Sequence, residues 1–211
     1  MRIGILGTGT LASALGTVWA GAGHEIVVGG RSATKARDLA DRLGETGRAG
    51  TLRDAAAFGD VVLLAVLWPG VEDALGAAGA SDGVLAGKPL IDPTNAVEHG
   101  IGEILTPPGV SAAGRIADLA PESHVVKAFH LLPADTWSVP IPPTGTRPLV
   151  PLAGDGAAVR VVSRLVTDAN ATPMAFGGPS RYRQLEEVAG FVIAAAFSGS
   201  NPAAAVPAVN V

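Results

Sequence analysis

The sequence predicts a single α/β domain, in which a doubly wound, mostly parallel sheet carries helices on both faces. Short apolar runs alternate along the chain with segments of helical pattern, which is typical of this class. The run from Val61 to Val66 is apolar throughout, as expected of a parallel strand covered on both sides. Aromatic residues make up only 4% of the chain, so we expect a core of Ala, Val, Leu and Ile that lets helices pack closely on the sheet.

The expected elements follow one another in regular order. Strands are expected at Ile3–Leu6, Ile26–Val28, Val61–Val66, Pro89–Asp92, Val125–Ala128, Leu149–Leu152 and Thr172–Ala175. Helices are expected at Leu11–Ala22, Ala33–Leu43, Asp54–Phe58, 111–119, Ala157–Thr167 and Ser180–Phe197. The stretch 133–148 is rich in Pro and Thr and should be irregular. We predict one domain over residues 1–199 and an extended tail over 200–211.

Composition excludes several classes of function. The formal net charge is −4 and no basic run is present, which argues against nucleic-acid binding. The chain has no cysteine, and its four histidines lack metal-ligand spacing, so we predict no metal site. We find no secretory signal pattern, and the apolar stretch Val188–Phe197 is too short to span a bilayer. These observations predict a cytoplasmic protein that is not bound to a membrane.

The first strand is followed by a glycine-rich turn. Residues 7–12 read Gly-Thr-Gly-Thr-Leu-Ala, which is the G-x-G-x-x-A variant of the dinucleotide-binding fingerprint of Rossmann-type sheets. Gly7 allows a tight turn, Gly9 lets the backbone approach a pyrophosphate, and the helix that starts at Thr10 directs free N–H groups at it. The alternative is a glycine-rich turn that binds nothing. The strand before the turn and the helix after it favour the binding interpretation.

The end of the second strand predicts which cofactor binds. NAD-specific sheets carry a carboxylate there, whereas this chain continues after Val28 with Gly29-Gly30-Arg31-Ser32, and Lys35 follows one helical turn later. A guanidinium binds a phosphate bidentately and is permanently charged, so this cluster predicts NADP. The alternative is that Arg31 and Lys35 only solvate a helix start, although cations there oppose the helix dipole.

With these motifs, the sequence resembles the family of NADP-dependent coenzyme F420 oxidoreductases over nearly its whole length. Similar domains occur in the membrane ferric reductases of animals and, more distantly, in pyrroline-5-carboxylate reductases. The segments that carry the resemblance are Gly7–Leu11, Gly23–Arg31, Leu67–Pro69 and Val125–Ala134. The resemblance implies a dimer that transfers a hydride between NADP(H) and a deazaflavin, the coenzyme F420, stacked over the carboxyl ends of the strands.

The resemblance also implies binding residues. The phosphate turn would use Thr8, Thr10 and Leu11, and the 2′-phosphate would be held at Gly30, Arg31 and Lys35, where the family usually has Ser in place of Gly30. We place the cofactor along the end of the third expected strand as well. Further cofactor-side positions are Val66, Leu67, Trp68 and Ala134, and the deazaflavin side includes Asn95 and Val97.

No catalytic triad or carboxylate pair is evident, which suits direct hydride transfer between cofactors. His130 follows an apolar strand and could hydrogen-bond an acceptor carbonyl or protonate an oxyanion, or it could cap local backbone. Asn95 could bind a carboxamide or the acceptor, or form an Asx turn. Trp68 could line the groove or only pack. For Asp92 we expect a structural role, in which its side chain bonds to the turn at Pro93-Thr94.

Two questions stay open at this point. The final helix is apolar nearly all round from Phe191 to Phe197, so it must be buried, either in a dimer interface or in the chain's own core. The hydride acceptor could also be another small molecule, such as a flavin, a ferric chelate, an imine or a carbonyl. A third possibility is a non-enzymatic NADP(H) sensor.

Overall fold

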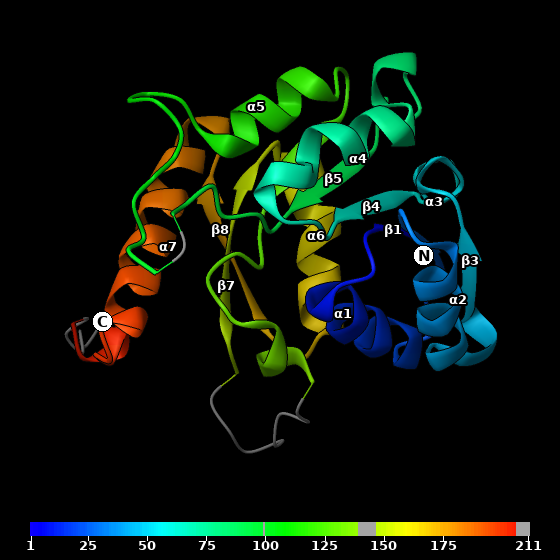
Figure 1. The fold of residues 1–211 in the computed structure, drawn as a ribbon, viewed down its shortest axis with the longest axis horizontal. Helices are drawn as coiled ribbons and strands as arrows, with labels where there is room; N and C mark the ends of the chain where they lie inside the picture. Colours follow the sequence, from blue (N-terminus) through cyan, green and yellow to red (C-terminus); the bar gives the residue numbers. More distant parts are fainter. Residues whose placement is uncertain (99, 139–146, 206–211) are drawn as a thin grey trace.

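In the computed structural model, which describes residues 1–98, 100–138 and 147–205, eight strands form one continuous sheet. The strands are β1 (Arg2–Leu6), β2 (Glu25–Gly29), β3 (Gly47–Gly50), β4 (Val61–Leu64), β5 (Pro89–Asp92), β6 (His124–Lys127), β7 (Leu149–Gly154) and β8 (Thr172–Gly177). The helices are α1 (Thr10–Gly21), α2 (Ala33–Arg42), α3 (Leu52–Phe58), α4 (Val71–Ala78), α5 (Ala112–Leu119), α6 (Gly156–Asp168) and α7 (Tyr182–Phe197). This arrangement confirms the predicted α/β class (Figure 1).

The strand order β3-β2-β1-β4-β5-β6-β7-β8 makes the sheet doubly wound. The first six strands are parallel, and their order reverses between β1 and β4. At such a point the two neighbouring connections leave toward opposite faces, so a crevice opens outside the carboxyl ends of the strands. The glycine-rich turn follows β1 directly and therefore lies at this crevice.

The last two strands extend the same sheet, as the sequence suggests, but β7 runs antiparallel to β6. Only two residue pairs join them, Val126 with Gly154 and Lys127 with Ala153. Most of β7 therefore projects beyond the carboxyl end of β6, on the same side as the crevice. β8 lies at the outer edge and pairs parallel to β7.

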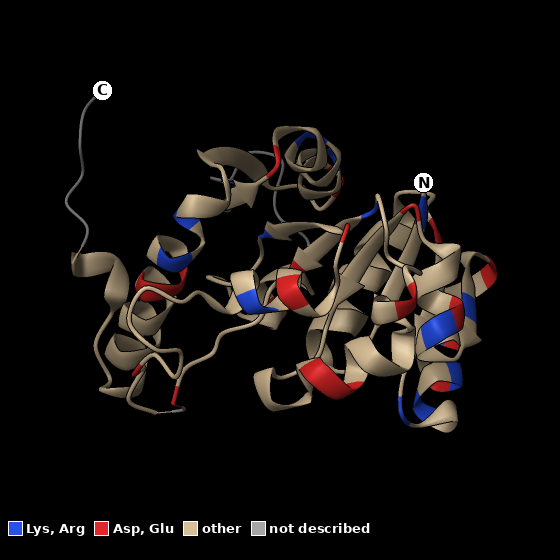
Figure 2. Cartoon of the chain, turned by 90° about the horizontal axis from the view of Figure 1, so that it is seen from above, with Lys and Arg blue, Asp and Glu red and all other residues tan. Residues whose placement is uncertain are grey.

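Helices cover both faces and divide the core into two layers. One layer packs α1, α2 and α6 against the sheet, and the other packs α3, α4, α5 and α7. Charged residues lie mainly on the outer surfaces of the helices, with both signs intermixed on α2 and α7 (Figure 2). No large surface of one sign is evident among the described residues, in agreement with the absence of a basic run.

Two elements escape prediction, and two predicted segments differ. β3 has the sequence Gly-Arg-Ala-Gly, which carries no strand propensity, and α4 is a short helix with a glycine in its middle. The strand expected to reach Val66 ends at Leu64. Where an extended tail is expected, residues Pro202–Ala205 form a 3-10 turn, and residues 206–211 lie outside the described part, as do 139–146 of the expected irregular stretch.

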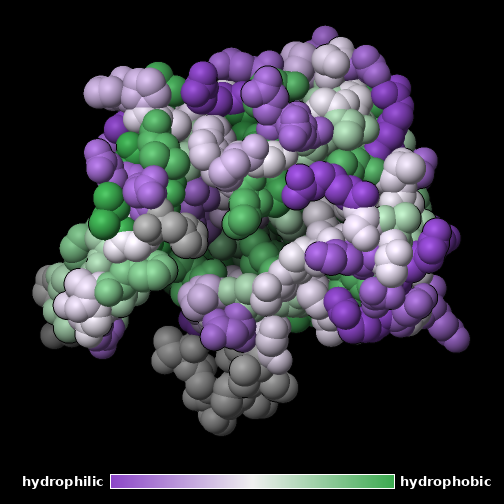
Figure 3. Space-filling model, in the orientation of Figure 1, coloured by the Kyte–Doolittle hydropathy of each residue, from purple (hydrophilic) through white to green (hydrophobic). Residues whose placement is uncertain are grey.

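The end of α7 is not buried within the chain, so the core-burial alternative is wrong for this segment. Phe191 is 51% exposed and Phe197 is 62% exposed, and Val188 adds to the same surface. Figure 3 shows apolar colouring at the lower left of this face, where the C-terminal end of α7 lies. Among the described residues, no helix has the length and apolar character needed to cross a bilayer.

Candidate cofactor site

Gly7 sets the shape of the turn that closes the crevice. Its φ of +128° lies in a region that L-residues rarely adopt, and a Cβ built on it would stand 2.0 Å from the carbonyl oxygen of Ala65. Its N–H donates to the carbonyl of Gly29 at 2.8 Å, which ties the turn to the end of β2. The fingerprint's first glycine is therefore required by close approach between the ends of β1, β2 and β4.

Gly9 has a different role from Gly7. It adopts ordinary extended backbone as the N-cap of α1, and a Cβ built on it would meet no atom within 4 Å. The N-terminus of α1 has no side-chain cap and no acidic residue in its first turn. The backbone at Gly9 thus leaves open space in front of uncapped N–H groups, which is the arrangement that accepts a pyrophosphate.

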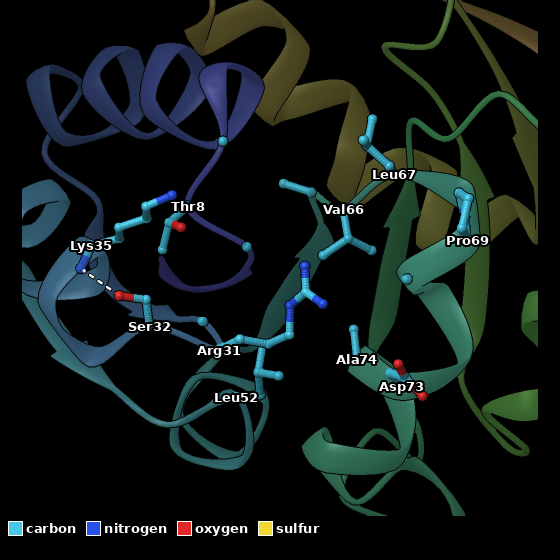
Figure 4. A pocket seen from close by; sticks show the side chains of 15 residues that line it. Thr8, Arg31, Ser32, Lys35, Leu52, Val66, Leu67, Pro69, Asp73 and Ala74 are labelled. Carbon is cyan, nitrogen blue, oxygen red and sulfur yellow. Dashed lines mark hydrogen bonds between the residues drawn. The ribbon is translucent and has the colours of Figure 1, made fainter. Parts of the chain in front are cut away.

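A cleft of about 620 Å³ lies in front of this turn. The predicted cofactor residues that line it come from the ends of β1, β2 and β4, and they are Gly7, Thr8, Gly9, Gly30, Arg31, Ser32, Lys35, Val66 and Leu67. In Figure 4, the guanidinium of Arg31 extends into the middle of the cleft, and the side chain of Lys35 extends toward Thr8. Residues from three separate strand ends thus converge on one hollow.

The basic residues of the cleft have no acidic partner. Neither Arg31 nor Lys35 forms an ion pair with any described residue, and both side chains are exposed. Ser32 is the N-cap of α2, and its hydroxyl accepts the backbone N–H of Lys35 at 3.3 Å. Two cations, a hydroxyl and a helix N-terminus therefore face the same solvent-filled space, which fits a phosphate group.

The missing serine at position 30 has a steric explanation. A Cβ on Gly30 would lie 2.8 Å from Cγ2 of Thr8 and 3.6 Å from its hydroxyl oxygen. The side chain of Thr8 thus occupies the space that a side chain at position 30 would need. The two positions are coupled, so that the hydroxyl at this corner of the cleft comes from the phosphate turn rather than from the end of β2.

Sequence reasoning missed part of the lining. Leu52 lines the cleft beside Arg31, Asp73 and Ala74 face it from the other side, and Ala65, Pro69 and Gly70 also line it. Leu52 begins α3 and follows β3, whereas Asp73 and Ala74 lie in the first turn of α4. The helix expected at Asp54–Phe58 begins after Leu52, and α4 is not predicted from the sequence. Recognition of β3 as a strand would have placed Leu52 at the carboxyl edge of the sheet.

Several predicted residues do not line this cleft. Trp68 packs its side chain against the apolar layer and lines a different groove between α4 and α5. Thr10 and Leu11 lie in the first turn of α1, behind the phosphate turn, and Leu11 packs on the core. Val97 is buried and bridges to Ile104, and Ala134 begins a 3-10 turn that packs on α1.

The acceptor-side residues Asn95 and His130 meet at the ends of β5 and β6. The side-chain amide of Asn95 donates to the backbone carbonyl of His130 at 2.9 Å. The Oδ1 atom of Asn95 is buried without a hydrogen-bond partner among the described residues. This contact differs from the Asx turn considered above, because it joins two strand ends that are far apart in sequence.

His130 itself is buried, with 5% of its surface exposed. Neither ring nitrogen has a hydrogen bond of normal geometry within the described chain. Burial lowers the pKa of His130 well below its usual value of 6.5, the nearby Lys127 ammonium lowers this pKa further, and a contact with the backbone of Leu185 opposes both effects. The ring is therefore neutral at pH 7, so it acts as a hydrogen-bond donor or acceptor and not as an imidazolium acid.

The residue before His130 carries backbone strain. Phe129 has a φ of +63°, a left-handed conformation that costs a bulky residue roughly 1–3 kcal/mol. Its ring is held edge-on by two tryptophans, Trp19 at 5.9 Å and Trp137 at 5.3 Å between ring centroids. The aromatic contacts anchor this turn on one face of the sheet, whereas Lys127, two residues before Phe129, packs toward α7 on the other.

Fold and cleft together define a class, an NADP-binding α/β protein of Rossmann type. The sequence comparison finds a match over part of the chain: residues 2–96, which build the turn, the basic loop and the end of β4, are similar to the family described as "NADP oxidoreductase coenzyme F420-dependent". The similarity covers the segment that carries the cofactor-binding motifs and a little less than half of the chain. No cluster of three or more possible metal ligands occurs among the described residues.

Similar proteins come from bacteria and from an animal. A proposed F420-dependent NADP-reductase of Arthrobacter sp. FB24 is 26% identical, with a TM-score of 0.79 and 96% of both chains covered. The hypothetical protein SMa0349 of Sinorhizobium meliloti is 26% identical, with a TM-score of 0.75 and coverage of 86% of this chain and 87% of that one. Metalloreductase STEAP3 of Rattus norvegicus is 30% identical over 189 residues, which are 89% of this chain and 36% of the rat protein. The chain therefore spans about a third of that relative.

Proposed function

We propose that the protein transfers a hydride between NADP(H) and the deazaflavin coenzyme F420. The observation that carries this proposal is the cleft at the switch point, where an uncapped helix start, Thr8, Arg31, Ser32 and Lys35 surround one space. The family match to residues 2–96 and the similarity to a protein described as F420-dependent support the choice of acceptor.

The residues of the cleft would divide the cofactor between them. The open space at Gly9 and the N-terminus of α1 suit the pyrophosphate, and the cations Arg31 and Lys35 suit the 2′-phosphate. Leu52 beside Arg31 and Ala74 on the opposite side supply apolar surface, between which a planar adenine could lie. When bound, NADPH supplies the hydride, so this chain's residues need only bind, orient and exclude water.

The acceptor half would use Asn95 and His130. The amide of Asn95 keeps its oxygen free as an acceptor, and the neutral imidazole of His130 keeps one N–H as a donor. A ring that carries adjacent carbonyl and N–H groups, as a deazaflavin does, offers the complementary pair. Both ring nitrogens of His130 and the Asn95 oxygen are buried, so these atoms would have to become accessible when the acceptor binds.

A second candidate acceptor is a ferric chelate. It is favoured by one observation, the 30% identity to a protein named a metalloreductase over nearly the whole of this chain. An imine, carbonyl or flavin acceptor, or a sensor without an acceptor, would use the same NADP cleft. The discriminating property is therefore turnover and not cofactor binding.

We also propose that the protein works in the cytoplasm as a homodimer formed through α7. The exposed apolar residues of this surface are Ile101, Leu105, Val188, Phe191 and Phe197. They come from α7 and from the loop before α5, which packs tightly on it through Gly102 and Gly190. The two segments therefore form one continuous surface.

The test is a set of parallel assays on the purified protein. NADPH is mixed with oxidised F420, with flavin mononucleotide or with a ferric chelate, and the loss of each acceptor's absorbance is followed. Turnover with F420 at least about tenfold faster than with the others is expected. Faster turnover with the ferric chelate would replace F420 by the second candidate, and NADPH binding without turnover would leave the sensor. Failure to bind NADPH would contradict the cleft assignment itself.

A further inference from the structure

A buried group of charges lies beneath the acceptor half of the site. Lys127 at the end of β6 is fully buried, Asp92 at the end of β5 is fully buried, and Glu186 on α7 is 3% exposed. The ammonium of Lys127 lies 3.0 Å from Oδ2 of Asp92 and 3.4 Å from Oε1 of Glu186. It also donates to the backbone carbonyl of Thr94 at 2.5 Å. Three partners therefore match the three N–H bonds of the ammonium group.

The two carboxylates are held in turn by backbone and hydroxyl donors. Oδ1 of Asp92 accepts from the N–H and from the hydroxyl of Thr94, at 2.8 and 2.7 Å, which confirms its predicted bond to this turn. Glu186 accepts from the N–H groups of Ala112 and Ala113 at 2.9 and 3.0 Å, in the first turn of α5. The group is thus fully bonded and tied to four elements.

Stability alone does not account for this group. Buried ion pairs can often be replaced by apolar residues of similar volume without loss of stability, because desolvation offsets most of the attraction. An aliphatic side chain at position 127 would fill the same space without that desolvation. What such a side chain could not do is hold the carbonyl of Thr94.

That carbonyl belongs to the peptide that leads into Asn95. The side-chain amide of Asn95 donates to the backbone of His130, which follows the strained Phe129. A chain of contacts therefore runs from Lys127 through Thr94 and Asn95 to His130. Its two hydrogen bonds each join the ends of β5 and β6, where ligands of such sheets bind.

We propose that Lys127 is a positioning residue for the acceptor half of the site. By donating to the carbonyl of Thr94 it fixes the Asn95 amide, and through this amide it fixes the backbone of His130. Its effect on catalysis rests on the function proposed above. Its effect on the conformation of Asn95 and His130 does not, and the two can be tested apart.

The charge of Lys127 acts on His130 as well. The charged groups on the elements around the imidazole are Asp92 on β5, Lys127 on β6, and Glu186, Arg183 and Glu187 on α7, the last two on its outer side. Among these, the Lys127 ammonium lowers the pKa of His130. Loss of this ammonium would leave Asp92 and Glu186 as the nearest buried charges, so the pKa of His130 is expected to rise.

The decisive comparison is Lys127→Met against Glu186→Gln. Both remove the ion pair between Lys127 and Glu186, but only the first also removes the contacts of Lys127 with Asp92 and with the Thr94 carbonyl. For Lys127→Met we expect kcat with F420 to fall by about 10- to 100-fold, with KM for NADPH within about twofold, because the adenosine cleft is remote. For Glu186→Gln we expect a change in kcat of no more than about threefold. An equal loss of kcat in the two variants would show that Lys127 acts only as a structural ion-pair partner.

A double-mutant cycle tests whether Lys127 acts through Asn95. If it does, Asn95→Ala lowers kcat much less in the Lys127→Met background than in the wild type. If Asn95→Ala lowers kcat by the same factor in the Lys127→Met background as in the wild type, the proposal is overturned. Should Lys127→Met fail to fold, the double variant Lys127→Met/Asp92→Asn removes one of the two carboxylates left without a partner. This double variant then takes the place of Lys127→Met in both comparisons, with Asp92→Asn as its reference.

A readout without turnover separates this proposal from the proposed function. In NMR spectra of the ligand-free protein, Lys127→Met is expected to shift the Asn95 side-chain amide and the His130 ring signals and to raise the His130 pKa, whereas Glu186→Gln shifts the Asn95 amide little. Unchanged Asn95 signals in Lys127→Met would overturn the positioning role. If the Asn95 and His130 signals shift in Lys127→Met but the wild-type protein does not reduce F420, the positioning role of Lys127 is upheld and only the choice of F420 as acceptor is rejected.

Discussion

The NADP cleft is open, and its polar and basic residues lie close in sequence to β1 and β2, whereas the acceptor half is built from buried groups that distant segments bring together. In the cleft, Arg31 and Lys35 face solvent without acidic partners. At the ends of β5 and β6, the charges are paired and the polar atoms of Asn95 and His130 lie inside. The comparison indicates that the cleft recognises a charged ligand by itself, and that the acceptor half depends on the integrity of the core around it.

The largest expected effect concerns the two glycines of the turn. Gly7→Ala should prevent stable folding or lower the free energy of unfolding by several kcal/mol, because its Cβ would collide with the Ala65 carbonyl in a left-handed conformation. Gly9→Ala should fold with nearly unchanged thermal stability but bind NADPH at least about tenfold more weakly, because its Cβ enters the space for the pyrophosphate. Thermal melts and NADPH titrations of both variants measure this, and normal NADPH affinity in Gly9→Ala would contradict the placement.

The next effect separates the two cofactors. Arg31→Ala should raise the Kd for NADPH by about 10- to 100-fold, since a hydrogen bond to a charged group contributes about 1.5–3 kcal/mol, and should change the Kd for NADH little. Arg42→Ala, at the other end of α2, is the matched control for loss of a positive charge. Equal weakening of NADPH and NADH by Arg31→Ala would show that the guanidinium does not recognise the 2′-phosphate.

The sequence predicts the open half of the site much better than the buried half. The turn at Gly7–Gly9 and the residues Gly30, Arg31, Ser32 and Lys35 form local patterns with a direct physical meaning, and all of these residues line the cleft. The turn role of Asp92 is also local, and it is confirmed. The meeting of Lys127 with Glu186 depends on how α7 returns to the sheet after an antiparallel strand, and no pattern near either residue specifies this. β3 is missed for a related reason, because pairing with β2 and not propensity makes it a strand.

A pH effect is expected for the buried half alone. The folded pKa of His130 is lowered below 6.5, so at pH below about 6.5 the unfolded chain takes up a proton that the folded chain does not. The free energy of unfolding should therefore fall by about 1.4 kcal/mol per pH unit from this residue, until the pH passes the folded pKa. In denaturant titrations at pH 7, 6 and 5, His130→Gln should show a shallower fall than the wild type. His124→Gln, an exposed histidine at the start of β6, serves as the control, and an unchanged slope in His130→Gln would refute this assignment.

The smallest expected effect tests the coupling between Thr8 and Gly30. Gly30→Ser should weaken NADPH binding several-fold, because the new Cβ displaces the Thr8 side chain. Thr8→Gly/Gly30→Ser should recover most of that affinity, since it removes the obstacle and restores one hydroxyl at the same corner. Additive losses in the double variant would mean that the two positions do not share this space.

The edges of the sheet have a consequence for self-association. In β8, the N–H of Thr172 donates to the carbonyl of Pro148 on the β7 side. The backbone nitrogen of the next residue, Pro173, therefore faces the open edge, and a proline has no N–H to donate there. The opposite edge, β3, is four residues long and includes two glycines and an arginine. Neither edge is a good template for adding a strand from another molecule, since short, charged or proline-containing edges resist such pairing. The fold is thereby protected against growth by sheet extension into fibrils, and copies of this chain that associate are directed to their helical surfaces.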